Sequence, residues 1–170
     1  MVFLAAYVAS IVAANWLLQT VGVVPVLGLA VPAGTFAAGF AFTLRDLTQE
    51  RLGRGWSVAA IALGTAVSAL VSPALALASC LAFSVSEGLD FLAYQPLRER
   101  RPLLAVTLSN TVGLVADSVL FLALAFGSLE YLPGQVAGKA AATAAAVIGL
   151  RLLRWNASTW GRTRPTGSRP

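Results

Sequence analysis

The sequence SNTVGLVADSVLFLALAFG, residues 109–127, decides how the rest of the chain is interpreted. The stretch is long and apolar enough to cross a bilayer as a helix, yet Asp117 lies deep inside it. A carboxylate at that depth costs about 2.5–3.5 kcal/mol on insertion scales, so it must face a protein interior or a water-filled cavity. One face of the helix, at spacings of three and four residues, carries Asn110, Gly113, Asp117 and Phe121. This face predicts either the wall of a small polar cavity or a structural aspartate satisfied by neighbouring helices.

The composition indicates a membrane protein built of helices. The chain has 170 residues, of which 58% are hydrophobic and only 11% are charged, against about 25% charged in soluble domains. Apolar runs long enough to span a bilayer recur along its length. The net charge of +5 could suggest a nucleic-acid partner, but the arginines lie at helix ends and in the tail, which argues against a DNA-binding face.

The residue types present give no sign of an enzyme or of a bound cofactor. The sequence has no histidine and a single cysteine, which excludes a disulfide within the chain and a Cys/His zinc site. It also lacks a phosphate-binding loop, a nucleophile–base pair and a set of metal ligands. We therefore expect a protein without cofactor or metal that is not an enzyme.

We predict an all-α integral membrane protein with one transmembrane domain over residues 1–154 and a basic, disordered cytoplasmic tail over residues 155–170. The domain is expected to contain six transmembrane helices, at residues 2–20, 31–50, 56–71, 74–94, 103–126 and 131–153. The first is interpreted as a retained helix, because no basic segment of a signal peptide precedes it. Its ridge of small residues, Ala5, Ala9 and Ala13, allows close approach of a helix from this chain or from another.

Charged residues in two other predicted helices have candidate roles inside the membrane. Glu87 and Asp90 share one face of the helix over residues 74–94, where two carboxylates would repel each other. That pair could be a proton-coupling site or a static pair, and we favour the static interpretation. Lys139 and Asp117 each lie roughly 12–14 Å from the same end of consecutive antiparallel helices, at 1.5 Å rise per residue. We expect these two to pair, because pairing reduces the burial cost of both charges.

Four blocks of the sequence resemble the queuosine precursor transporter family, also called the putative vitamin uptake transporter family. The blocks are FTLRDLTQERLG (42–53, with Asp46 at a fixed point), the segment 78–101 with Glu87 and Asp90, the segment 109–126 with Asp117, and the segment 134–153 with Lys139. The resemblance implies six helices arranged like the substrate-binding subunits (S-components) of energy-coupling-factor vitamin transporters. It also implies uptake through the cell inner membrane of 7-cyano-7-deazaguanine (preQ0) or a related deazapurine.

Such a substrate presents adjacent N–H donors, a carbonyl acceptor and a flat ring, which sets the chemistry of its site. The expected acceptors are Asp117, Glu87 and Asp90. The residues expected to donate a hydrogen bond, or both to donate and to accept, are Lys139, Asn110, Asn15 and Gln135. Phe83 and Phe91 are expected to stack on the ring, and the resemblance adds Asp46.

Two other functions fit the same sequence. The chain could be a substrate-binding subunit for another vitamin-like molecule, working with a separate energising module or as a homo-oligomer. It could also be a non-transporting scaffold whose buried charges only fix the helix register. A scaffold should gain no stability from a ligand, whereas a binding protein should.

We predict that both termini lie in the cytoplasm. Apart from Lys139, the basic residues fall around the end of the second predicted helix and its loop, in the loop after the fourth, and at the end of the sixth and in the tail. Cytoplasmic connections carry the excess of Lys and Arg. A reporter that works only in the cytoplasm should be active when fused to the tail and inactive when fused near residue 128. A reporter that works only outside the cytoplasm should show the reverse pattern. A tail reporter active only outside the cell would contradict this topology.

Overall fold

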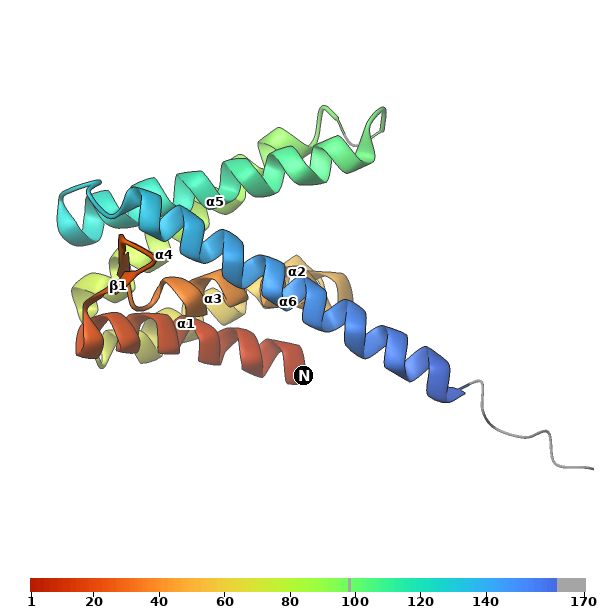
Figure 1. Cartoon of the computed structure of the whole chain (residues 1–170), viewed down its shortest axis with the longest axis horizontal. Helices are drawn as coiled ribbons and strands as arrows, with labels where there is room; N and C mark the ends of the chain where they lie inside the picture. The colour runs from red at the N-terminus through yellow and green to blue at the C-terminus, as the bar shows by residue number, and fades with distance from the viewer. Residues whose placement is uncertain (98, 162–170) are drawn as a thin grey trace, which may run out of the picture.

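The computed structural model of the chain describes residues 1–97 and 99–161 and is mostly helical (Figure 1). Over these residues it contains six helices: α1 Val2–Val21, α2 Thr35–Leu52, α3 Arg54–Ala69, α4 Pro73–Tyr94, α5 Pro102–Phe126 and α6 Leu132–Gly161. This confirms the predicted helical class. Within the described residues, three segments are long and apolar enough to cross a membrane: α1, α4 and the Thr107–Phe126 part of α5. The chain is therefore a multi-pass membrane protein.

A short β-hairpin that the sequence analysis did not predict separates α1 from α2. Its strands, β1 (Val23–Val26) and β2 (Leu29–Pro32), pair antiparallel. Leu27 and Gly28, between the strands, both have positive φ angles, of 51° and 81°. Two residues in this conformation form the type I′ turn whose twist suits a hairpin. The predicted second helix, starting at residue 31, therefore begins later, at Thr35, because β2 occupies the residues before it.

Small residues of α6 bring it against this hairpin and the start of α2. A Cβ atom at Gly134 would collide with the carbonyl oxygen of Ala30, and one at Gly138 would lie 2.8 Å from the γ-methyl of Thr35. Further along, a Cβ atom at Gly39 of α2 would lie 2.6 Å from the Cβ of Ala142. The two helices therefore pack backbone to backbone, as small residues allow in membrane proteins.

Residues that favour helix ends mark several boundaries. Gly53, with φ of 91°, separates α2 from α3, and Gly127 ends α5 in the left-handed conformation. Pro73 and Pro102 occupy the first turns of α4 and α5.

The tail prediction needs correction at its start. The helix α6 continues past residue 153 to Gly161, because residues 150–160 contain neither glycine nor proline to end it. Residues 162–170, the rest of the predicted disordered tail, lie outside the described residues.

The helices form two groups that meet at one end of the molecule (Figure 1). The first group contains α1, α2 and α3, with α6 crossing over α2, and the second is the antiparallel pair of α4 and α5. The short α3–α4 and α5–α6 connections join the groups at the end where the β-hairpin lies. The opposite end holds the α2–α3 and α4–α5 connections. We call it the arginine-rich end, after Arg51, Arg54, Arg100, Arg101 and Arg151.

The inward face of α1 differs from the alanine ridge noted in the sequence. Its buried residues are Tyr7, Ile11, Asn15 and Leu18, at the spacing of one helix face. Ala5 and Ala9 are exposed, and Ala13 is only partly buried. The ridge therefore faces outward instead of packing into this chain.

The close contact of α2 with α6 should make Gly39 intolerant of any side chain. Replacing Gly39 by Ala places a methyl group 2.6 Å from Ala142 Cβ and 2.8 Å from the Lys139 carbonyl oxygen. Overpacking of this kind costs typically ~1–3 kcal/mol. Thermal unfolding of detergent-purified protein should show a clear loss of stability. The matched control is Gly88→Ala in α4, where a Cβ meets nothing within 4 Å; equal losses for both would contradict this packing.

Candidate functional site

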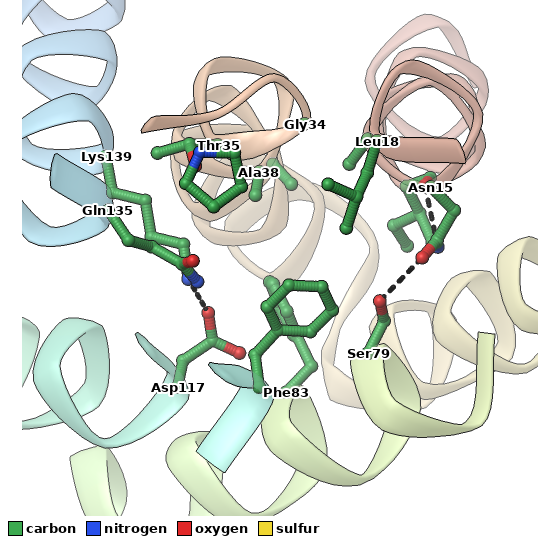
Figure 2. A pocket seen from close by; sticks show the side chains of 15 residues that line it. Asn15, Leu18, Gly34, Thr35, Ala38, Ser79, Phe83, Asp117, Gln135 and Lys139 are labelled. Atoms are coloured by element: carbon green, nitrogen blue, oxygen red, sulfur yellow. Dashed lines mark hydrogen bonds and ion pairs between the residues drawn. The ribbon is translucent and has the colours of Figure 1, made fainter. Parts of the chain in front are cut away.

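A small cavity lies among α1, α2, α4, α5 and α6 (Figure 2). Its volume is about 50 Å³. Its wall is mainly apolar. The polar side chains that reach it are Asn15, Thr35, Ser79, Asp117, Gln135 and Lys139. A mainly apolar wall with a few polar groups is typical of sites for small molecules.

The ion pair of Asp117 with Lys139 forms one wall of the cavity and confirms the predicted pairing. The Nζ atom of Lys139 donates to Asp117 Oδ2, and it lies 3.3 Å from Ser118 Oγ. Only 3% of Asp117 and 1% of Lys139 is exposed, so water does not screen the pair. In Figure 2 the second carboxylate oxygen of Asp117 points away from Lys139, toward Phe83. That oxygen remains available as an acceptor.

Two further polar groups on the cavity wall are buried without a partner. Thr35 Oγ1 and Gln135 Oε1 have no hydrogen-bond partner among the described residues. Burial of a polar atom without a partner costs about 1–3 kcal/mol, so such atoms call for an explanation such as a bound ligand. The sequence analysis missed Thr35, because its position at the start of α2 depends on the hairpin before it.

Asn15 connects three helices and has little left to offer a ligand. Its Nδ2 donates to Ile11 O and to Ser68 Oγ, both at 3.2 Å. Its Oδ1 accepts from Ser79 Oγ at 2.8 Å (Figure 2). One amide hydrogen is therefore used within α1, the other ties α1 to α3, and the carbonyl oxygen ties α1 to α4. The structure places Asn15 at the cavity as a residue that shapes the wall.

Aromatic rings close the cavity toward the arginine-rich end. Phe83 lines the cavity, and its ring centroid lies 5.0 Å from that of Phe42 and 6.3 Å from that of Tyr7. Phe121 of α5 also lines the cavity. The ring of Phe83 thus offers the flat apolar surface that the sequence analysis expected of it.

Three predicted site residues lie in a separate polar cluster beyond these rings. We call it the Arg45 cluster; its members are Arg45, Asp46 and Gln49 of α2 and Glu87 and Asp90 of α4. Arg45 Nη2 lies 2.8 Å from Asp46 Oδ1 and 3.6 Å from Asp90 Oδ2, and Gln49 Nε2 donates to Glu87 Oε1. Asp46, Glu87 and Asp90 are therefore close to one another but outside the cavity lining.

Two predicted residues lie away from both groups. Phe91 stacks against the Arg54 guanidinium, whose carbon is 4.4 Å from the ring centroid. Asn110 is exposed. Helical spacing placed Asn110 on the face of Asp117, but near the arginine-rich end α5 packs mainly against α4, so that face has no helix to cover it. Of the predicted residues, the cavity brings together Asp117, Lys139, Gln135, Asn15 and Phe83.

Comparison with protein families agrees with the resemblance seen in the sequence. Residues 66–153, just over half of the chain, match the family model described as "Putative vitamin uptake transporter". The chain belongs to this family. Neither curated proteins nor solved structures give a significant match. Membership of the vitamin uptake transporter family indicates a membrane transporter of a small molecule rather than an enzyme. The matched region includes Asp117, Gln135 and Lys139, whereas Thr35 and Asn15 lie before it.

The two charges of the cavity wall should be strongly coupled in stability. Asp117→Leu or Lys139→Met alone leaves one charge buried without its partner, which costs about 3–5 kcal/mol. The double variant removes both charges and should recover much of that loss. The free energies of unfolding of the four purified proteins, the original, the two single variants and the double variant, give this coupling. Ser118→Ala, which keeps the pair, is the control and should change little; losses that simply add would show that the charges act independently.

Proposed function

We propose that the protein takes up a queuosine precursor, 7-cyano-7-deazaguanine or a related deazapurine, through the cell inner membrane. Membership of the vitamin uptake transporter family supports the transport of a small molecule. The arrangement of Asp117 and Lys139 on the cavity wall carries the proposal of a guanine-like substrate. On this proposal all six helices cross the membrane in an arrangement like that of the S-components, and both termini are cytoplasmic.

A guanine-like edge complements this pair of side chains. The edge presents two adjacent N–H donors beside one carbonyl acceptor, and a carboxylate accepts from two adjacent donors. In this pose the free oxygen of Asp117 accepts from the ring and amino N–H groups, while Lys139 donates to the carbonyl. Phe83 covers one face of the ring, because it lies beside Asp117 in Figure 2. Hydrogen bonds to charged groups are worth about 1.5–3 kcal/mol, enough to select this edge in a dry site.

The remaining polar atoms fit the other side of the same ligand. Gln135 Oε1 is a buried acceptor without a donor, and the Thr35 hydroxyl, which can both donate and accept, also has no partner among the described residues. A deazapurine base carries a further N–H on its five-membered ring. The small volume of the cavity favours a compact, flat base over a larger molecule. The substrate would then satisfy polar atoms that are without partners in its absence.

We expect purified protein in nanodiscs to be stabilised by 7-cyano-7-deazaguanine. A ligand at a hundred times its Kd adds about 2.7 kcal/mol to the free energy of unfolding. The analogue without the exocyclic amino group should bind more weakly, because Asp117 then loses one donor. Asp117→Asn should lose most of the ligand-induced gain in the free energy of unfolding, with the ligand-free variant as its reference. Glu50→Gln, on the exposed side of α2, is the matched control and should keep the shift.

Reconstitution of the same purified protein into sealed vesicles separates the alternatives. Binding together with uptake into vesicles that contain only this protein supports a self-sufficient carrier. Binding without uptake supports a substrate-binding subunit that needs a separate energising module, for which the exposed Ala5–Ala9 ridge is a free helix surface. No stabilisation by any deazapurine would contradict the proposed substrate, and no binding of any vitamin-like molecule would favour a scaffold.

A further inference from the structure

The two groups of helices are held together differently at their two ends. At the hairpin end, short connections join α3 to α4 and α5 to α6, and α5 packs against α6 there. Toward the arginine-rich end, α4 and α5 diverge from α6 in Figure 1. The backbones of α2 and α4 make almost no close contact along their described lengths. The α4–α5 pair is thus fixed at one end and held by side chains at the other.

Side chains of the Arg45 cluster bridge α2 and α4 where their backbones do not meet. Arg45 reaches Asp90, with 3.6 Å between Nη2 and Oδ2, and Gln49 donates to Glu87. Both bridges start on α2 and end on α4. They lie between the cavity and the arginine-rich end, because Arg45 and Gln49 follow the cavity residues Thr35 and Ala38 along α2.

A continuous set of contacts links this cluster to the cavity. Phe83 lines the cavity and stacks on Phe42 with 5.0 Å between ring centroids. The guanidinium carbon of Arg45 in turn lies 5.4 Å from the Phe42 ring centroid. A movement of α4 that broke the bridges would therefore separate Phe83 from Phe42 and uncover the cavity on this side.

The bridges are incompletely satisfied in the closed arrangement. Arg45 is only 3% exposed, yet its Nη1 atom has no hydrogen-bond partner within the described part of the chain, and neither has Asp90 Oδ1. The 3.6 Å separation of Arg45 from Asp90 is also longer than a good hydrogen bond. Water entering between α2 and α4 would supply the missing hydrogen-bond partners. Separating these helices therefore costs less free energy than separating helices whose polar groups are all hydrogen-bonded to each other.

We propose that the Arg45 cluster is the gate between the cavity and the arginine-rich end, which opens when α4 and α5 swing away from α2. Its role as the release step for a substrate rests on the proposed function, whereas its role as a gate to the cavity does not. In the closed state Arg45–Asp90 and Gln49–Glu87 hold α4 to α2, beside the contact of Arg54 in α3 with Phe91 in α4, and the Phe42–Phe83 stack seals the cavity. Arg45 and Asp90 are positioning residues that touch no substrate.

A cysteine on the cavity wall tests the gate without any ligand. In a Cys80→Ser background, Ala38→Cys places a thiol on the cavity lining. A membrane-impermeant thiol reagent is applied to either side of sealed vesicles, and a separate Arg100→Cys protein reports which side the arginine-rich end faces. Arg45→Gln should raise the labelling rate from that side by about fivefold or more, the lower end of typical couplings between two states. Labelling from the opposite side should not rise.

Two further variants make the result decisive. Asp90→Asn is nearly isosteric and partly exposed, so it should fold and reproduce the increase even if Arg45→Gln does not fold. Arg51→Gln removes a charge from the same helix, but its guanidinium contacts Phe3 instead of α4, so it should leave labelling unchanged. Unchanged labelling in folded Asp90→Asn, or an equal increase in Arg51→Gln, would overturn the gate. A failure of deazapurine binding would affect only the proposed function.

Discussion

The buried ion pair of Asp117 with Lys139 is the constraint on which the rest of the structure depends. Neither charge can be buried alone without a large cost, so α5 and α6 must bring both to the same place in the interior. The helix α6 can do so only because glycines let it pack directly on α2 and the hairpin. The requirement that stabilises the fold therefore also creates a cavity wall with an acceptor and a donor side by side.

The polar residues inside the bundle fall into two groups with different chemistry. The cavity group has one satisfied ion pair, one fully used amide at Asn15, an unpartnered acceptor at Gln135 Oε1 and an unpartnered hydroxyl at Thr35, which suits a polar ligand that brings at least one donor. The Arg45 cluster has an unpartnered donor and an unpartnered acceptor, which water can satisfy. Aromatic rings separate the groups, so the binding and the opening of the cavity depend on different side chains.

The sequence was informative where one helix face determines a contact. Spacing and depth were enough to pair Asp117 with Lys139, because both helices are long and their ends are marked. Spacing alone could not show that Asn110 lies where no helix covers α5, since it gives the direction of a side chain and not its neighbours. The hairpin escaped prediction because its strands are four residues long and its turn places Leu27 at positive φ. Thr35 was missed with it.

The two ends of the cavity are closed by interactions of different kinds, so opening each end requires a different change in the structure. At the hairpin end the lining includes Leu18 and Pro32, and covalent connections hold the two helix groups together nearby. At the other end the closure depends on charged and amide side chains that span a gap between backbones. Apolar contacts have no preferred geometry and resist separation over their whole area. A few polar bridges join particular atoms and can break together, exchanging their partners for water. One end can therefore open by exchanging polar partners for water while the apolar contacts and covalent connections at the hairpin end stay in place.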